Sequence, residues 1–275
     1  MLLDADVERW LREDVGHHDV TNDVSGTAAG RLVAKESGVV AGLDAAVAVF
    51  EYLDCEADAL AAAGDAVEAG EPALRVEGPA RAVLRGERPA VNVAAHAAGV
   101  ATRTREAVEA ARSVDPDVRV ACTRKTTPGL RGVEKRAVAA AGGDTHRLDL
   151  SHMVMVKDNH VAELGLEAAV ERFRERVSFA TKVEAEVEAP EDAPRAARAG
   201  ADVVLLDNMS PAETGRAVDL LGEAAADLDR AVLAEASGGI TVETVPDYAA
   251  TGVDVISMGS LTHSAPALDY SFRLA

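Results

Sequence analysis

The chain has 275 residues, of which 48% are hydrophobic and 3% aromatic, and its formal net charge is −19. This length suits one large α/β domain, or a barrel with a smaller companion domain. The negative charge disfavours binding to nucleic acid or to an anionic membrane, and no apolar run approaches the roughly 20 residues of a membrane span. The first ten residues carry acids where a signal peptide carries basic charge, so we expect a cytoplasmic protein.

The acidic surface leads to a prediction about salt. Lys is scarce beside Arg, and an acidic, Lys-poor surface is what a cytoplasm of high salt content favours. Self-repulsion is strongest at low ionic strength and weakens as salt screens it. We therefore expect the melting temperature to rise between low and molar salt in thermal unfolding experiments. An unchanged melting temperature would contradict this interpretation.

The first part of the chain mixes helical and extended patterns. Apolar spacing predicts helices over residues 7–14, 45–52 and 91–113, a strand over 31–37, and a pair of strands over 71–84 around Gly78 and Pro79.

The second part alternates short apolar runs with helical segments. The runs are residues 118–122, 153–156, 183–187, 203–206, 231–234 and 253–256, and the helical segments are 133–141, 163–176, 191–199, 211–223 and 242–250. This alternation predicts parallel strands with helical crossovers, and continuous apolar strands indicate burial on both faces. Six such units favour an incomplete barrel, while periodicity alone leaves an open sheet as the alternative.

Residues 123–160 form a basic segment in an acidic chain. They hold seven Lys or Arg residues against four acids, including three of the five Lys of the chain. Ordinary surface ion pairing is one explanation. The other is a site that binds a small polyanion, because Arg matches carboxylates and phosphates bidentately and Lys acts as a point charge.

Polar residues follow each apolar run of the second part, where the carboxyl ends of barrel strands converge on an active site. They are Thr123, Arg124 and Lys125; Lys157, Asp158, Asn159 and His160; Glu186; Asp207 and Asn208; Ser237, Gly238 and Gly239; and Gly259 and Ser260. Glu186 and Asp207 could hold Mg²⁺, directly or through waters, or pair with a neighbouring cation. The late glycines allow backbone N–H groups to approach a phosphate.

Together these motifs resemble the quinolinate phosphoribosyltransferase family over nearly the whole chain. The motifs are TRKTTPGLR at residues 123–131, HR at 146–147, KDNH at 157–160, LLDN at 205–208, EASGGI at 235–240 and DVISMG at 254–259. The resemblance implies an N-terminal α/β sandwich domain over residues 1–105, joined by 265–275, and an incomplete barrel of six to seven strands over 106–264. It also implies a homodimer or higher homo-oligomer.

The implied reaction belongs to de novo NAD biosynthesis. Quinolinate and phosphoribosyl pyrophosphate give nicotinate mononucleotide, pyrophosphate and CO₂, with Mg²⁺ as cofactor. Lys125, Lys157, Glu186 and Asp207 are the implied catalytic residues, and the last two also the Mg²⁺ acids; Glu184 ranks below Glu186. The implied substrate-binding residues are Arg88 (entering the neighbouring subunit's site), Thr123, Arg124, Lys125, His146, Arg147, Lys157, Glu186, Asp207, Ser237, Gly238, Gly239, Ser257, Gly259 and His263.

The chain departs from the family pattern at Thr145, near Asp149 and over residues 16–19. These positions support the site or the domain packing, so the implied reaction stands while local loops could differ. Three rivals remain: a phosphoribosyltransferase using nicotinate or another anionic acceptor, a barrel lyase or isomerase acting on a sugar phosphate, and a non-catalytic sensor of pyridine metabolites. The lyase would need a general base, for which His146, His160 and His263 are available.

Overall fold

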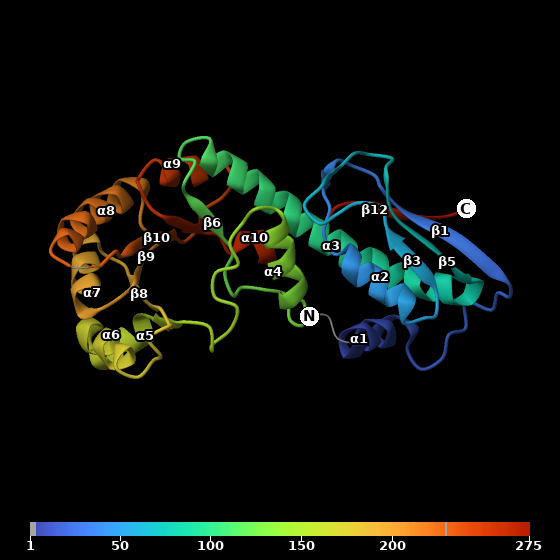
Figure 1. Cartoon of the computed structure of the whole chain (residues 1–275), viewed down its shortest axis with the longest axis horizontal. Helices are drawn as coiled ribbons and strands as arrows, with labels where there is room; N and C mark the ends of the chain where they lie inside the picture. The colour runs from blue at the N-terminus through green and yellow to red at the C-terminus, as the bar shows by residue number, and fades with distance from the viewer. Residues whose placement is uncertain (1–3, 229) are drawn as a thin grey trace. The chain divides into compact units, whose positions relative to one another are not determined.

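A computed structural model describes residues 4–228 and 230–275 (Figure 1), so the first three residues of the acidic N-terminal stretch lie outside the described residues. The chain divides into two compact units. Unit 1 comprises Met1–Arg105, Lys125–Gly142 and Leu261–Ala275, and unit 2 comprises Glu106–Arg124 and Gly143–Ser260. Within the described ranges, no helix combines the length and apolar character needed to cross a bilayer.

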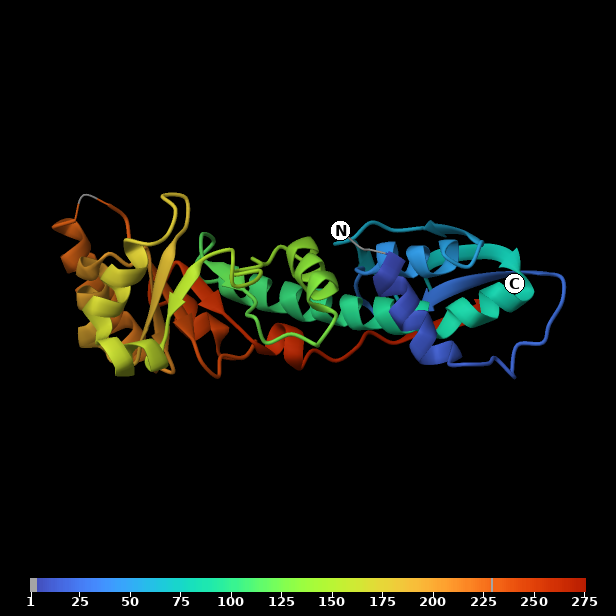
Figure 2. The same cartoon turned by 90° about the horizontal axis from the view of Figure 1, so that it is seen from below.

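Unit 1 is built on an antiparallel sheet with strand order β12-β1-β5-β3. Its strands are β1 (Thr27–Ala34), β3 (Glu56–Ala59), β5 (Pro72–Pro79) and β12 (Tyr270–Leu274), and a separate ribbon pairs β2 (Gly38–Val39) with β4 (Ala66–Val67). Its helices are α1 (Asp4–Val15), α2 (Leu43–Glu51), α4 (Arg131–Ala140), most of α3 (Ala80–Arg112) and most of α10 (Ser260–His263). Figure 2 shows α1, α2 and the first part of α3 beside the sheet.

The core of unit 1 lies between the sheet and its helices. Leu32 of β1 and Leu74 of β5 are fully buried, and they share one hydrophobic cluster with Phe50 of α2. The ring of Phe50 stacks on Phe272 of β12 with centroids 5.9 Å apart. Sheet and helices thus bury one continuous apolar layer, and the predicted α/β sandwich is confirmed.

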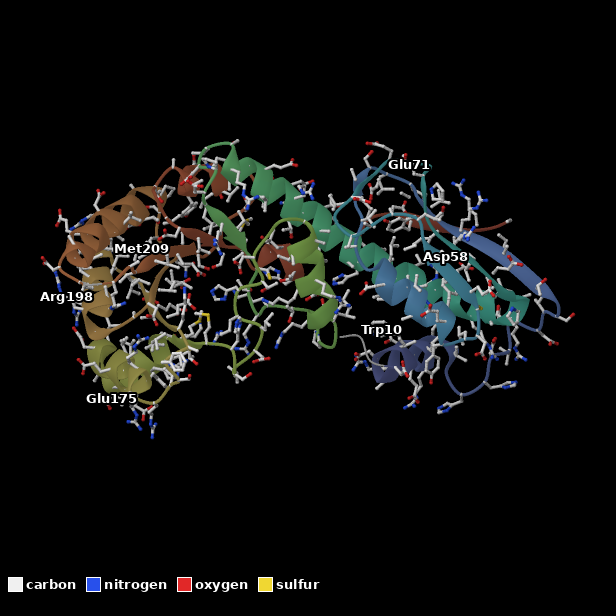
Figure 3. All side chains as sticks on the ribbon, in the orientation of Figure 1. Trp10, Asp58, Glu71, Glu175, Arg198 and Met209 are labelled. Atoms are coloured by element: carbon white, nitrogen blue, oxygen red, sulfur yellow. The ribbon has the colours of Figure 1, made fainter. Side chains whose placement is uncertain are left out.

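Unit 2 contains one parallel sheet with strand order β6-β11-β10-β9-β8-β7. Its strands are β6 (Arg119–Ala121), β7 (Val154–Val156), β8 (Val183–Val187), β9 (Val203–Asp207), β10 (Leu233–Ser237) and β11 (Val255–Ser257). The helices are α5 (Asp158–Leu164), α6 (Leu166–Arg174), the short 3₁₀ helix η1 (Pro190–Asp192), α7 (Ala193–Ala199), α8 (Pro211–Ala226) and α9 (Val245–Ala249). In Figure 3, Arg198 of α7 points away from the strands, as expected for an outer helix.

The strand order is that of a barrel with one gap. Neighbours from β7 to β11 follow chain order, and β6 then pairs with β11. No ladder joins β6 to β7 among the residues that the structure describes; an isolated bridge between Ala121 and Asp144 lies beside β6. The predicted incomplete parallel α/β barrel is confirmed with six strands.

Local chemistry fixes where the crossover helices begin. At the start of α8, Ser210 Oγ accepts a hydrogen bond from the backbone N–H of Glu213, and the Glu213 carboxylate accepts one from the backbone N–H of Ser210. Pro211 occupies the first helical position, where a missing N–H costs nothing. This reciprocal cap starts α8 directly after the loop that follows β9.

The predicted pair of strands over residues 71–84 is wrong. β5 ends at Pro79, and the helix α3 begins at Ala80 and continues through Pro89 to Arg112. The apolar pair Val83 and Leu84 suited either structure, and Val83 is buried in the cluster of unit 1. Packing of a helical face therefore decided the outcome.

The division into units also differs from the predicted boundary. The predicted barrel domain includes residues 125–142 and 261–264. In the structure both segments belong to unit 1. Contacts inside unit 1 explain the first segment, because the Glu134 carboxylate lies 2.8 Å from His96 Nε2 and Arg136 pairs with Asp44 at 3.3 Å. One division between the two units falls after residue 105.

Candidate active site in unit 2

The strands of unit 2 carry their functional side chains in register. Glu186 of β8 and Glu235 of β10 both pair with Leu205 of β9, and Ser237 pairs with Asp207. Because side chains alternate along a strand and paired positions share a face, these residues lie on one face of the sheet, with Asp207 and Ser237 at its carboxyl ends. This arrangement is the one expected of an active site at the carboxyl ends of a barrel.

Cations and acids meet at this end. Lys157 follows β7, and its Nζ lies 2.6 Å from Glu186 Oε2. Arg147 is only 8% exposed, and its Nη2 contacts Met155 Sδ at 3.2 Å. Burial and the nearby Arg124 lower the pKa of Arg147, while Glu184 and Glu186 oppose that shift. A buried arginine among other cations is suited to an anionic ligand.

Two carboxylates in this group have the chemistry of Mg²⁺ ligands. Glu186 and Asp207 lie on adjacent strands, and carboxylate oxygens suit this hard cation. Asp207 Oδ2 already accepts a hydrogen bond from Asn208 Nδ2 at 2.6 Å, and Glu186 is paired with Lys157. Neighbouring polar groups thus hold both carboxylates in place, and their oxygens could bind a cation directly or through waters.

The turn after β10 can only be built with glycine. Gly238 has φ +100, and a Cβ atom there would lie 2.3 Å from Asn208 Oδ1 and 2.7 Å from its backbone N. Asn208 itself has φ +55 and donates its backbone N–H to the carbonyl oxygen of Ser237 at 2.9 Å. The neighbouring Gly239, with φ +63, has open space around it. The backbone of this turn thus lies next to open space, as a phosphate site requires.

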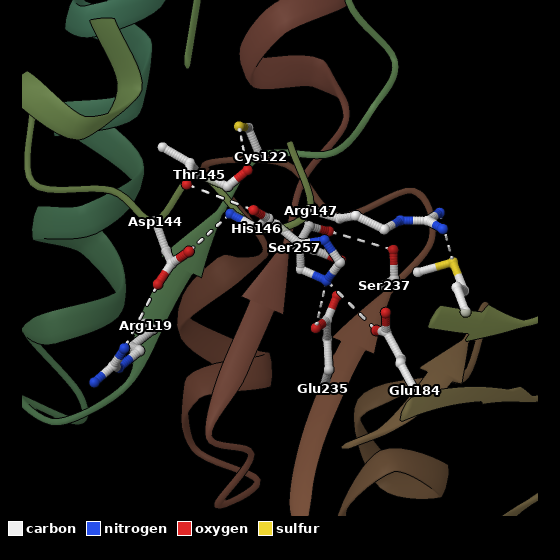
Figure 4. A network of polar contacts seen from close by, with 11 residues as sticks. Arg119, Cys122, Asp144, Thr145, His146, Arg147, Glu184, Glu235, Ser237 and Ser257 are labelled. Carbon is white, nitrogen blue, oxygen red and sulfur yellow. Dashed lines mark hydrogen bonds and ion pairs between the residues drawn. The ribbon is translucent and has the colours of Figure 1, made fainter. Parts of the chain in front are cut away.

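Glu235 is not among the predicted site residues and Glu184 ranks below Glu186, but the structure places both buried acids beside His146. Glu235 and Glu184 are 2% and 0% exposed, and both approach His146 Nε2, at 3.1 and 3.4 Å (Figure 4). Their ligand atoms and that of His146 all lie within 4.8 Å of one another, a grouping that could also hold a metal ion. The predicted apolar run ends at Ala234, one residue before Glu235, whereas β10 runs from Leu233 to Ser237.

A cavity of about 690 Å³ lies at the other end of the strands. It is lined by residues at the amino ends of the strands, among them Arg119, Lys182, Val203 and Leu233, and it reaches inward as far as His146 and Glu235. The predicted site residues Lys157, Glu186 and Asp207 do not line it. The cluster of His146, Glu184 and Glu235 therefore lies between this cavity and the carboxyl ends.

The predicted site residues fall into both units. Thr123, Arg124, His146, Arg147, Lys157, Glu186, Asp207, Ser237, Gly238, Gly239, Ser257 and Gly259 belong to unit 2. Arg88, Lys125 and His263 belong to unit 1. In that unit the carbonyl oxygen of Lys125 accepts a hydrogen bond from Thr262 Oγ1 at 2.7 Å, and Arg88 is 58% exposed beside Glu87.

The departures from the family pattern make local contacts. The carbonyl oxygen of Thr145 accepts a hydrogen bond from Cys122 Sγ at 3.6 Å, and Asp149 Oδ1 accepts one from the backbone N–H of Ser151 at 2.8 Å. In the residue 16–19 segment, hydrogen bonds from Arg85 and from backbone N–H groups hold the pKa of Asp19 well below its usual range. Thr145 and Asp19 are thus held by residues distant in sequence, and Asp149 by its own loop.

Fold and site define an enzyme of the α/β-barrel class with a polyanion site at the carboxyl ends of its strands. Residues 18–98 match the N-terminal domain, and residues 100–273 the C-terminal domain, of quinolinate phosphoribosyl transferase. The chain therefore belongs to the quinolinate phosphoribosyl transferase family.

Individual relatives agree with this assignment. The chain is 44% identical over 273 residues to the probable nicotinate-nucleotide pyrophosphorylase (carboxylating) of Methanothermobacter thermautotrophicus, covering 98% of this chain and 97% of that one. It is 43% identical over 275 residues to the human nicotinate-nucleotide pyrophosphorylase (carboxylating), covering 99% and 91%. The crystal structure of NadC from Streptococcus pyogenes is similar with a TM-score of 0.89 at 38% identity, covering 99% and 96%.

Proposed function

We propose that this protein transfers the phosphoribosyl group of phosphoribosyl pyrophosphate to quinolinate, with loss of CO₂, to form nicotinate mononucleotide and pyrophosphate in NAD biosynthesis. The observation that carries the proposal is the joint placement of Arg147, Lys157, Glu186 and Asp207 at the carboxyl ends of one parallel sheet. Family membership supports the choice of both substrates. We also propose that the protein carries out this biosynthetic reaction in the cytoplasm.

The cations and the acids have different tasks in this reaction. Arg124, His146 and Arg147 bind the carboxylates of quinolinate and Lys157 a phosphate oxygen, because these are the cationic side chains of the site. The lone pair of the pyridine nitrogen is free, so attack on the anomeric carbon needs no general base. Positive charge that develops on the ribose is offset by Glu186 and Asp207. Positioning and electrostatics therefore carry the catalysis.

Loss of CO₂ follows from the same bond. Once the nitrogen is bonded to the ribose, the ring is cationic, so the electron pair of the bond to the 2-carboxylate can remain on C2 as CO₂ leaves, and C2 then takes a proton from water. The 5′-phosphate is bound by the turns of unit 2 at Ser237, Gly238 and Gly239 and at Ser257 and Gly259. When bound by Glu186 and Asp207, Mg²⁺ would supply charge stabilisation to the pyrophosphate group.

One assay tests the proposed reaction. Quinolinate consumption and CO₂ release are followed with and without phosphoribosyl pyrophosphate and Mg²⁺. We expect consumption only with both, and one CO₂ for each quinolinate. Turnover of nicotinate without CO₂ release, or binding without turnover, would contradict the proposal. Loss of activity on chelation that Mg²⁺ restores would support the cofactor assignment.

We further propose a homodimer in which Arg88 enters the neighbouring site. Its 58% exposed side chain is available to a partner. Chains carrying Arg88→Ala and chains carrying Lys125→Ala are each expected to be inactive, and co-expression of both should restore about one quarter of the activity, since random pairing gives one intact site in half of the dimers. Differently tagged chains allow the mixed dimer to be purified. No restoration in the mixed dimer would show that each site is self-contained.

A further inference from the structure

Two buried acids have no task in the proposed reaction. Glu184 of β8 and Glu235 of β10 are 0% and 2% exposed, on strands two apart in the sheet. Among the described residues, neither carboxylate oxygen of Glu184 has a hydrogen-bond partner, and Oε1 of Glu235 has none. Burying a carboxylate without compensation is costly, so a second group must offset these charges.

His146 is that group. Its Nε2 lies 3.1 Å from Glu235 Oε2, within hydrogen-bond distance, and 3.4 Å from Glu184 Oε1. Figure 4 shows both carboxylates on the same side of the imidazole ring. The ring's Nδ1 has no hydrogen-bond partner among the residues described.

The backbone of His146 is held as firmly as its ring. Its φ of +49 lies in the left-handed region, which costs a non-glycine residue energy. Its backbone N–H donates to Asp144 Oδ1 at 2.7 Å, and Asp144 pairs with Arg119 at 3.5 Å. A strained conformation that several contacts impose is typical of a residue placed for function.

The electrostatics of His146 agree with its position between Glu184 and Glu235. Burial alone would lower the pKa of His146, but the close contacts with the carboxylates of Glu184 and Glu235 and their negative charges outweigh it and raise the pKa to about 10. Burial raises the pKa of Glu184, and the charge of Glu235 adds to this while His146 opposes it. Arg147 also faces this group, and its charge interacts with Glu184 and Glu186. Asp144 faces His146 from its own loop.

We infer that Glu184 and Glu235 are positioning residues, which clamp the Nε2 edge of His146 so that Nδ1 is presented as a fixed cationic donor to a carboxylate of the acceptor. This inference rests on the proposed function. The two acids act through His146 and do not touch the substrate. The clamp lies between the carboxyl ends of the strands and the cavity of about 690 Å³ at their other end, so in this inference it forms the floor of the acceptor site.

The same three side chains could instead hold a metal ion, since their ligand atoms lie within 4.8 Å of one another. The clamp is favoured because the His146–Glu235 contact is already a hydrogen bond and Arg147 supplies further positive charge beside Glu184. A dication would be repelled by that guanidinium. Metal binding is therefore an outcome that the experiment distinguishes.

The test is a double-mutant cycle between Glu235→Gln and His146→Gln. In the otherwise unaltered enzyme, Glu235→Gln should raise the KM for quinolinate about tenfold, the loss expected for one charge-assisted hydrogen bond, and leave the KM for phosphoribosyl pyrophosphate unchanged. In the His146→Gln background the same substitution should have no further effect, because the residue through which it acts is gone. Glu184→Gln provides a second cycle if Glu235→Gln fails to fold.

Glu171→Gln is the matched control, because Glu171 is an exposed acid on the helix α6; it should leave both KM values unchanged. An equal loss in both backgrounds, or a shift in the KM for phosphoribosyl pyrophosphate instead, would overturn the clamp. So would elemental analysis that finds one transition metal per chain, lost in Glu235→Gln. Turnover of quinolinate by the unaltered enzyme tests the proposed function separately, so the two failures are distinguishable.

Discussion

Replacement of Arg147 by Ala is expected to lower kcat/KM for quinolinate by roughly 30-fold to several thousand-fold, the range that corresponds to about 2–5 kcal/mol for truncating one partner of a buried charge pair. Arg147 is 8% exposed, and its charge interacts with Arg124 and with the acids Glu184 and Glu186. Its removal leaves those acids with less compensation and the acceptor with one bidentate partner fewer. Steady-state kinetics with quinolinate as the varied substrate measure the loss.

Arg176→Ala is the control for this prediction. Arg176 is exposed and lies after α6, so its truncation should change kcat/KM by less than about twofold, as expected of a surface position away from the site. Arg147→Lys should recover only part of the kcat/KM for quinolinate that Arg147→Ala loses, because Lys has no planar fork. Near-normal kcat/KM for quinolinate in Arg147→Ala would show that this arginine does not bind the acceptor.

Gly238→Ala is expected to harm stability and activity more than the addition of a single methyl group anywhere else in the site. The residue has φ +100, and the added Cβ would lie 2.3 Å from Asn208 Oδ1 and 2.7 Å from Asn208 N. The backbone strain alone costs about 1–3 kcal/mol of unfolding free energy, and the contact with backbone prevents relief by a rotamer change. Because Asn208 also holds Asp207, we expect kcat/KM for phosphoribosyl pyrophosphate to fall with stability.

Gly222→Ala is the matched control. Gly222 lies inside α8, and a Cβ there would meet nothing within 4 Å. Alanine should therefore raise the unfolding free energy by up to about 1 kcal/mol through its higher helix propensity and leave activity unchanged. Denaturant unfolding of both variants gives the comparison. Unfolding of Gly238→Ala at the denaturant concentration of the unaltered protein would contradict the assigned strain.

The carboxyl-end residues could be predicted because the chemistry follows directly after each buried run. Lys157 and Asp207 stand at the ends of clearly apolar strands, and parallel topology brings such ends together. Glu235 could not be found in this way. Its burial depends on β10 continuing to Ser237 and on the register that pairs it with Leu205, and both are set by neighbouring strands.

Glu184 carried a usable signal. It lies two residues before Glu186 in β8, and period-two alternation puts both acids on the same face. The sequence does not indicate that His146 is the partner of these acids. His146 reaches them from a loop, through a left-handed backbone conformation that no apolar pattern indicates. In unit 1, the start of α3 at Ala80 was missed for a similar reason, since only burial of Val83 separates helix from strand there.

The pairing of β12 with β1 has a consequence for synthesis on the ribosome. Residues 270–274 complete the sheet that residues 27–34 begin, so the N-terminal unit lacks an edge strand until the last residues of the chain have been made. Most of unit 2, residues 143–260, is contiguous and needs no such delay. The half of the protein that is translated first is therefore the half that finishes folding last, and until then β1 is an open edge at which chaperones or other nascent chains can bind.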